Sequence, residues 1–140
     1  MPTIFHKLVT RDAANAGNLT LAVEAATPEV MREGRLEIRP AEFVALADGR
    51  PLALTVRELG LLCALVRRSG RIVSREELYA VVWGRPFRKD ERSVDVYVRK
   101  LRHKLEQALP EQQFIHTHFG FGYRFHPEPS QLFHTSATSR

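Results

Sequence analysis

The sequence lacks several features that would place it in a narrow class of protein. It has one cysteine in 140 residues, so an internal disulfide is excluded. That residue, Cys63, stands in the apolar run LGLLCALV, where we expect a small buried thiol rather than a nucleophile. The start of the chain has no uninterrupted apolar core of the kind that a signal peptide needs, and no window approaches the length of a membrane span. We therefore expect a cytoplasmic protein with no membrane association.

Patterns typical of enzymes are also absent from the sequence. It shows no Ser-His-Asp arrangement, no paired-carboxylate pocket and no phosphate-cradling glycine loop. His116 and His118 stand two apart on one face of a predicted strand, but two ligands without a third nearby make a poor metal site. We predict that the protein is not an enzyme and that it holds no metal and no cofactor.

What the chain does have is positive charge, concentrated in one segment. The net charge is +5 and the isoelectric point is about 9.9, a balance that favours an anionic partner, most commonly nucleic acid. Between Arg85 and Lys104 there are eight basic and three acidic residues, so this segment alone has a net charge of +5. An apolar fraction of 44% is ordinary for a globular domain, and the length suffices for one core.

The chain divides into three parts by its secondary-structure signals. Residues 1–34 are Ala-rich and form an N-terminal extension in which NLTLAV could be a strand. In TPEVMREG, Thr27 as N-cap, Pro28 at the first helical position and Gly34 as stop indicate a short helix, and partial disorder is the alternative. Residues 35–126 carry clear signals for one folded domain. Residues 127–140 are a polar tail that we expect to be disordered.

The domain begins with short strands and two capped helices. RLEIR, EFVAL and PLAL predict three strands, with Asp48-Gly49 as a hairpin turn. In TVRELGLLCALVRRSG, Thr55 and Glu58 form a capping box. A brief strand, RIV, precedes SREELYAVVWG, in which Ser74 and Glu77 form a second capping box. The two helices are predicted to end at Gly70 and Gly84, and their apolar stripes are Leu59, Leu62, Cys63 and Val66, and Leu78, Val81 and Val82.

A third helix, about 91–109, contains the stretch RSVDVYVRKLRHKL, and FIHTHFGFGYRF follows it as a glycine-bearing hairpin. The helix buries the stripe Val94, Val98, Leu101 and Leu105, and opposite it stand Arg92, Val96, Arg99, Lys100 and His103. A solvated face would interleave acids with these bases, yet only Asp95 is placed to pair, toward Arg99. Val96, apolar at the centre of a charged face, suits contact with a thymine methyl in a major groove. The core uses the apolar stripe that a membrane-surface helix would need. We therefore favour DNA binding.

The segments LTVRELGLLCALVRRSGRIVSREELYAVVWG, RSVDVYVRKLRHKL and IHTHFGFGYRF together resemble the effector domain of OmpR/PhoB-type bacterial response regulators, over about residues 35–126. The resemblance implies an α+β winged helix-turn-helix with a small N-terminal antiparallel β-sheet, three helices and a C-terminal β-hairpin wing. It implies that the third helix enters the major groove and that the wing, residues 114–126, approaches the neighbouring minor groove. It also implies that two copies bind a direct repeat head to tail.

The resemblance assigns roles by position. The predicted base readers are Val96, Arg99 and Lys100. The predicted contacts to the DNA backbone are Trp83, Arg92, Ser93, Tyr97, Arg102 and Thr117. The wing residues are His118, Phe119 and Gly120. The loop GRPFRKDER, with Arg85, Phe87, Arg88 and Lys89, corresponds to the transactivation loop that touches RNA polymerase in this family, and a solvated connector is the equal alternative.

Two positions depart from the family pattern. The family's wing usually reads V-R-G, and its arginine enters the minor groove, whereas His118, Phe119 and Gly120 stand here. Phe119 supplies no cation for a narrow A-tract groove, so it stacks on sugar, wedges at a base step or covers the hairpin. We expect a weaker wing contact that is less sensitive to A/T content. Lys100 replaces an arginine that many members carry, which softens guanine discrimination.

We therefore predict a cytoplasmic, nucleoid-associated transcriptional regulator that binds specific double-stranded DNA. The alternative is a protein-interaction winged helix that docks on RNA polymerase or another regulator and contacts DNA non-specifically; nucleoid packaging is a third hypothesis. Only 34 residues precede the first predicted strand, without an acidic cluster, so we expect no phosphorylation in cis. A stand-alone regulator is favoured over a fragment of a longer one.

Overall fold

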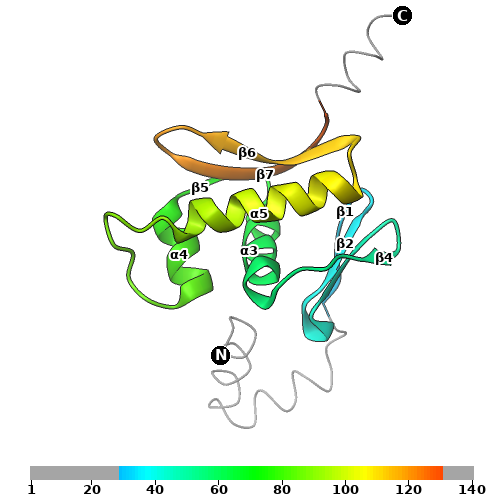
Figure 1. The fold of residues 1–140 in the computed structure, drawn as a ribbon, viewed down its shortest axis with the longest axis horizontal. Helices are drawn as coiled ribbons and strands as arrows, with labels where there is room; N and C mark the ends of the chain where they lie inside the picture. Colours follow the sequence, from blue (N-terminus) through cyan, green and yellow to red (C-terminus); the bar gives the residue numbers. More distant parts are fainter. Residues whose placement is uncertain (1–28, 131–140) are drawn as a thin grey trace, which may run out of the picture.

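The computed structural model describes residues 29–130, and this part begins with a four-stranded antiparallel sheet (Figure 1). Strands β1 (Met31–Glu33), β2 (Leu36–Arg39), β3 (Val44–Ala47) and β4 (Arg50–Pro51) lie side by side in that order. A short 3-10 helix, η1 (Pro40–Glu42), connects β2 to β3. The hairpin predicted at Asp48-Gly49 is confirmed, because both residues have positive φ angles, 52° and 78°, as a tight two-residue turn requires.

The N-terminal boundary differs from the sequence-based prediction. The predicted helix in TPEVMREG is wrong where it is described, because Met31–Glu33 form strand β1, in which Met31 pairs with Ile38 of β2. Gly34, at φ 64°, turns the chain between β1 and β2. Glycine after a polar run indicates a helix end or a hairpin turn equally well, and pairing with β2 decided between them. The proposed caps Thr27 and Pro28 and the strand NLTLAV lie outside the described residues.

The three predicted helices are present as α3 (Val56–Arg67), α4 (Arg75–Trp83) and α5 (Ser93–Ala108). The capping box of α3 is confirmed: the amide of Thr55 donates to the Glu58 carboxylate at 2.8 Å, and the amide of Glu58 donates to the Thr55 hydroxyl at 3.1 Å. Helix α3 ends at Arg67, before the predicted stop at Gly70. Gly84 ends α4 in the left-handed conformation, as predicted.

The second cap is only half of the predicted box. Ser74 accepts a hydrogen bond from the amide of Glu77 at 3.0 Å. The Glu77 carboxylate does not return to the cap; it accepts from Arg68 and Arg71, each at 2.7 Å. Two guanidiniums from the α3–β5 connection compete for this carboxylate more strongly than one backbone amide, because charge-assisted bonds are the stronger ones.

A three-stranded sheet forms the C-terminal part of the fold. Its order is β5 (Ile72–Val73), β7 (Gly122–Pro129) and β6 (Gln112–His118), all antiparallel. Strands β6 and β7 are the predicted hairpin, and β7 extends to Pro129, three residues past the predicted boundary at 126. A Cβ atom on Gly122 would lie 2.0 Å from the carbonyl oxygen of Val73, so β5 and the root of the hairpin approach too closely for any side chain there.

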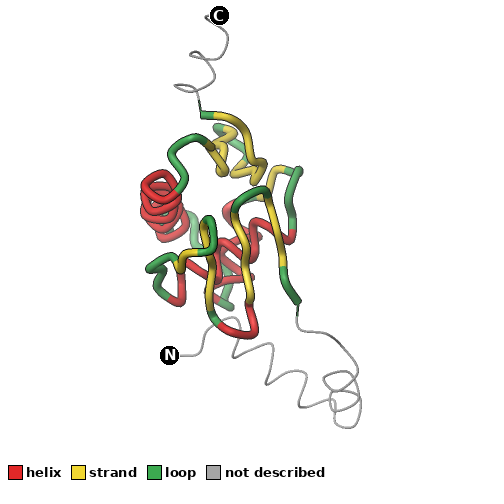
Figure 2. The backbone as a smooth tube through the Cα atoms, turned by 90° about the vertical axis from the view of Figure 1, so that its right-hand side faces the viewer, coloured by secondary structure: helices red, strands yellow, loops and turns green. Residues whose placement is uncertain are grey.

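The core lies between the helices and the two sheets, and Figure 2 shows α5 nearly end-on beside them. The predicted stripes of α3 and α5 are buried, and of the α4 stripe only Val81 stays partly exposed. The predicted α+β class, with a small sheet, three helices and a terminal hairpin, is confirmed. No helix within residues 29–130 has the length and apolar character needed to cross a bilayer.

Candidate nucleic-acid interface

Helix α5 presents two different faces. Val94, Val98, Leu101 and Leu105 are at most 2% exposed and anchor the helix to the core. The residues predicted for the opposite face are all exposed, namely Arg92, Val96, Arg99, Lys100 and His103. Val96, with 44% of its surface exposed, lies on this basic face, so the partition expected from the pattern is confirmed. The arrangement offers a row of cations around one apolar side chain.

Aromatic rings connect this face to the end of α4. The Tyr97 ring lies edge-on to Trp83, with centroids 5.5 Å apart, and the Lys100 ammonium lies 4.9 Å from the centre of the Tyr97 ring. The Arg57 guanidinium, from the first turn of α3, lies 4.8 Å from the Trp83 ring. Cation–π contacts of this kind are modestly favourable and help to hold a charged group in place. Arg57 was missed by the sequence analysis, because only packing brings α3 beside Trp83.

Asp95 does not pair with Arg99, contrary to the expectation from their spacing. Its carboxylate accepts a hydrogen bond from Arg75 Nε of α4 at 2.7 Å and another from the Tyr123 hydroxyl of β7. Burial acts to raise the pKa of Asp95, but these two donors outweigh it and hold the pKa below its ordinary value. Burial and the bond to Asp95 raise the pKa of Tyr123 to about 12. Arg99 has no hydrogen-bond or ion-pair partner among residues 29–130, so its guanidinium is available at the surface.

Two residues predicted to contact phosphate bind each other. Arg102 donates from Nε to the carbonyl of Ile115 at 3.1 Å and from Nη2 to the Thr117 hydroxyl at 2.5 Å. The Arg102 side chain is half-buried, and this burial lowers its pKa from the ordinary arginine value. These bonds fasten strand β6 to α5. Arg102 and Thr117 therefore have a structural role that the resemblance did not indicate.

The turn of the β6–β7 hairpin carries two exposed aromatic rings. Phe119 is 87% exposed and Phe121 is 72% exposed, and Gly120 lies between them at φ 84°. Of the three alternatives for Phe119, covering the hairpin is therefore excluded in this structure. Phe121 is not among the predicted wing residues, although the alternation of residues around two glycines indicates that it accompanies Phe119.

The two wing histidines have separate partners. His118 Nε2 accepts a hydrogen bond from Arg124 Nε at 3.2 Å, whereas His116 Nε2 lies 2.7 Å from the carbonyl oxygen of His126. Within residues 29–130, no group of three or more His, Cys, Asp or Glu side chains is placed to hold a metal ion. In this structure His118 faces a cation, and both histidines take part in the hydrogen bonding of the wing.

The loop between α4 and α5 is partly packed onto the fold. The Phe87 ring is half-buried and meets Tyr79 edge-on at 5.6 Å, and Arg85 donates to the Tyr79 hydroxyl at 2.8 Å. Phe87 thus serves first as an anchor of the loop, while Arg88 and Lys89 remain exposed. The predicted contact with RNA polymerase stays a prediction.

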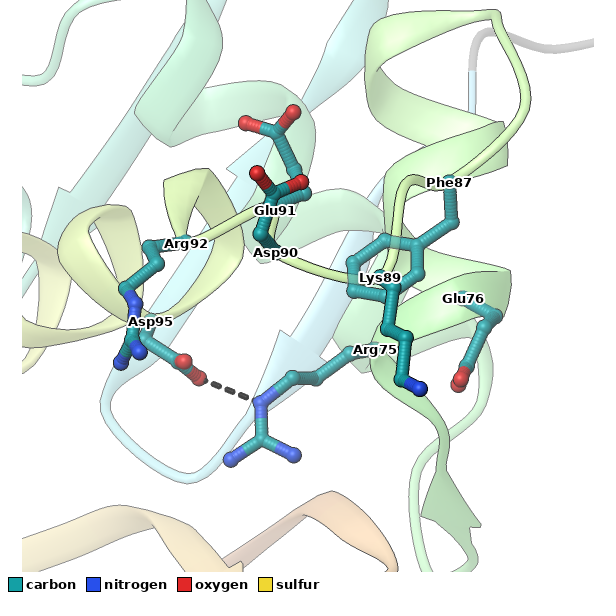
Figure 3. Close-up of a pocket in the computed structure, with 8 residues that line it drawn as sticks. All are labelled: Arg75, Glu76, Phe87, Lys89, Asp90, Glu91, Arg92 and Asp95. Carbon is teal, nitrogen blue, oxygen red and sulfur yellow. Dashed lines mark hydrogen bonds and ion pairs between the residues drawn. The ribbon is translucent and has the colours of Figure 1, made fainter.

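A cleft of about 320 Å³ opens where this loop meets the start of α5 (Figure 3). Arg92 lies on one side of the cleft, Lys89 and Glu76 lie on the other, and Arg75 points toward Asp95. Three cationic and four acidic side chains line the cleft, so its charges nearly cancel and it does not attract an anion. Nearby, the Ser93 hydroxyl donates to the Glu91 carboxylate, and α5 begins without a side-chain cap. The Glu91 carboxylate also accepts from the backbone amide of Ser93, so it takes the place of a side-chain cap at the start of α5.

Comparison with known proteins identifies transcriptional regulatory proteins as relatives of this chain. The family model described as "Transcriptional regulatory protein, C terminal" matches residues 49–125. The alkaline phosphatase synthesis transcriptional regulatory protein SphR of Synechococcus elongatus is 38% identical over 100 residues, which are 71% of this chain and 39% of that protein. The transcriptional activator protein IrlR of Burkholderia pseudomallei is 36% identical over 100 residues, 71% of this chain and 43% of that protein. The chain spans less than half the length of these curated relatives.

Solved structures agree with the fold. The DNA-binding domain of RstA from Klebsiella pneumoniae, solved in complex with the RstA box, superposes with a TM-score of 0.65 at 30% identity and covers 71% of this chain and 99% of that one. The DNA-binding domain of CpxR from E. coli gives a TM-score of 0.64 at 30% identity, over 69% of this chain and 95% of that one. The predicted family resemblance is confirmed.

Proposed function

The chain belongs to the OmpR/PhoB-type family of transcriptional regulatory C-terminal domains, and from this we propose that it reads a specific DNA sequence by placing α5 in the major groove. This is a family of DNA-binding domains, not of enzymes. The observation that carries the proposal is the exposed face of α5, on which Val96 is flanked by Arg99 and Lys100 while the opposite face is held in the core.

The three base readers have suitable chemistry. The Lys100 ammonium donates to guanine O6 and N7, Val96 packs on a thymine methyl, and Arg99 has a complete guanidinium fork free for a base edge or a phosphate. Tyr97 stabilises Lys100 from one side, at 4.9 Å, so the ammonium is partly oriented before it meets DNA. We infer that guanine preference at the Lys100 position is softer than an arginine would give.

Contacts to the sugar-phosphate backbone set the position of α5 in the groove. Arg92 is exposed beside the start of α5, where the positive helix end also favours a phosphate. Trp83, Ser93 and Tyr97 lie near this end of the interface, and we assign them to the same backbone path. Arg102 and Thr117 contribute mainly by holding the wing in position.

Selection of bound duplexes from a random pool, followed by affinity measurement across salt concentrations, tests the proposal. We expect a defined site, with log K falling steeply as log salt rises. Lys100→Ala is expected to relax preference at one position by a factor of about 10, because one base contact is removed. Glu106→Ala, an exposed change late in the same helix, is the matched control and should leave preference unchanged. If Lys100→Ala altered neither preference nor affinity, the groove assignment would be wrong.

A second function is supported by the α4–α5 loop. The exposed Arg88 and Lys89 suit a weak contact with an acidic surface of RNA polymerase or of another regulator. A gel-shift competition separates the two proposals: the protein-docking function gains if random duplex competes as well as a selected site at physiological salt. A head-to-tail pair on DNA is also proposed, and half-sites that repeat directly in the selected sequences would support it.

A further inference from the structure

The turn of the wing, which we call the wing tip, consists of Phe119, Gly120 and Phe121. Among the large apolar residues in the described part of the chain, its two phenylalanines are the most exposed, at 87% and 72%. An aromatic ring has a large apolar surface whose transfer from water is favourable. Two such rings on neighbouring turn positions form an exposed apolar patch, which is a feature typical of binding surfaces.

The backbone holds the wing tip away from the rest of the fold. His118 and Gly122 close the ladder, and the amide of Phe121 donates to the carbonyl of His118 at 2.8 Å. Immediately behind the tip, Gly122 packs against the backbone of Val73, where a Cβ atom would lie 2.0 Å from the carbonyl oxygen. The hairpin root is therefore clamped to β5, and the two rings project from a fixed base.

The wing tip also has a fixed relation to α5. Arg102 bonds Ile115 and Thr117 of β6, and Asp95 bonds Tyr123 of β7, so both strands of the wing are attached to the helix. In Figure 1 the turn of the hairpin lies on the left, on the same side as the start of α5, and the sheet β1–β4 lies on the right. The tip thus continues the surface that we assign to DNA.

Two arginines lie behind the wing tip, Arg75 and Arg124, and each is already paired with a carboxylate, Asp95 and Glu128 respectively. Arg124 donates to His118 at the base of the tip, and Arg75 lies 5.7 Å from the centre of the Tyr123 ring on the side of α5. The nearby carboxylate of Asp95 is already bound by Arg75 and Tyr123. The cations that can attract a polyanion are those on the exposed face of α5, such as Arg99 and Lys100. The apolar rings of the wing tip complement the apolar interior between the base pairs of a DNA duplex.

We propose that the wing tip is an apolar wedge: Phe119 enters the minor groove beside the site read by α5 and inserts at a base step, while Phe121 packs on the neighbouring sugar. This inference rests on the proposed function. Because insertion separates two stacked base pairs, the bound duplex bends. Pyrimidine–purine steps are the most easily unstacked and kinked, so the wing selects such a step at a fixed spacing from the α5 site. It does so through the deformability of the DNA and not through the negative potential of a narrow A-tract groove.

The test uses a selected duplex with a donor and an acceptor dye at its ends and a 2-aminopurine at the flexible step. With the unmodified chain, we expect the dyes to approach and the 2-aminopurine to brighten as it unstacks. Phe119→Ala should abolish both signals and weaken binding by about tenfold, the order expected for loss of one buried aromatic ring. The salt dependence should be unchanged, because no charge is removed.

Two further variants keep the test specific. Phe119→Leu retains an apolar wedge and should keep part of the bend. Phe43→Ala removes another exposed ring, 54% exposed at the end of η1, and should leave binding and bending as they were. A Phe119→Ala chain that still bends the duplex and brightens the probe overturns the wedge while leaving specific recognition by α5 intact.

Two other outcomes are informative. If Phe119→Ala abolishes self-association in sedimentation but not the bend, the wing tip binds a second copy of the chain and the wedge is overturned. If the unmodified chain binds selected and random duplexes equally, the proposed function fails, and the wedge fails with it. The two failures are distinguished by the selected-to-random affinity ratio, which the first leaves high and the second brings to one.

Discussion

The strength of the attachment between α5 and the wing can be measured directly. Arg102 makes two hydrogen bonds to β6, one to the Ile115 carbonyl at 3.1 Å and one to the Thr117 hydroxyl. Hydrogen bonds to a charged partner contribute about 1.5–3 kcal/mol each. We expect Arg102→Ala to lower the free energy of unfolding by about 3 kcal/mol and Thr117→Val to lower it by about 1.5 kcal/mol, since valine keeps the shape but not the hydroxyl.

The double variant isolates the bond between the two side chains. Urea unfolding of the original chain, both single variants and the double variant should give a coupling of about 1–2 kcal/mol for Arg102 with Thr117. A small domain has about 5–15 kcal/mol of stability, so the variants should remain folded. Strict additivity of the two single effects would refute the reasoning, because it would mean that the bond contributes nothing to stability.

DNA binding gives an independent reading of the same residue. If Arg102 contacted a phosphate, Arg102→Ala would reduce the slope of log K against log salt by about 0.9. If it holds the wing, as its bonds indicate, affinity falls while the slope stays unchanged. A lowered slope together with unchanged stability would show that the intramolecular bonds are incidental and that the family-based role is the correct one.

Two further predictions concern the core and the hairpin root. Lys104→Met leaves the Glu58 carboxylate, 2% exposed, without the ammonium that lies 2.7 Å away, and should cost about 3 kcal/mol in urea unfolding. Burial acts to raise the pKa of Glu58, but Lys104 and Thr55 hold the folded pKa below the ordinary value of 4.5. The contribution of Glu58 to stability is therefore complete above pH 4.5 and is lost as pH falls through the folded pKa. Urea unfolding at several acidic pH values should show this loss, and a flat profile would contradict it. Gly122→Ala places a Cβ against Val73 and should cost more than about 3 kcal/mol in thermal unfolding, whereas Gly49→Ala, in open space at φ 78°, should cost about 1 kcal/mol, and equal losses would refute the clash.

The elements that the sequence predicted well are those with local causes. The capping box of Thr55 with Glu58 and the turn at Asp48-Gly49 involve residues close together in the chain, and both are present. The two faces of α5 follow from helical spacing, so the buried stripe and the exposed Val96 could be assigned before any tertiary contact was known.

The predictions that failed depended on competition between local and distant partners. Asp95 is spaced for Arg99 on its own helix, but Arg75 and Tyr123 reach it from α4 and β7 and form stronger, partly buried bonds. Glu77 is spaced to complete a capping box, but two arginines bind it instead. Nothing in the local pattern around Gly34 distinguishes a helix end from the β1–β2 turn.

The sequence alone determined the fold class, the basic character of one helix face, and the position of an apolar residue within that face, because helical and strand periodicities and short-range caps are properties of neighbouring residues. Tertiary structure decided which partners the polar side chains bind and which apolar side chains stay exposed. Packing of β6 on α5 turned Arg102 and Thr117 toward each other, and packing of β5 behind Gly122 left Phe119 and Phe121 projecting into solvent. Such outcomes depend on which segments far apart in the chain come to lie within hydrogen-bonding or van der Waals distance, and only the folded chain contains that information.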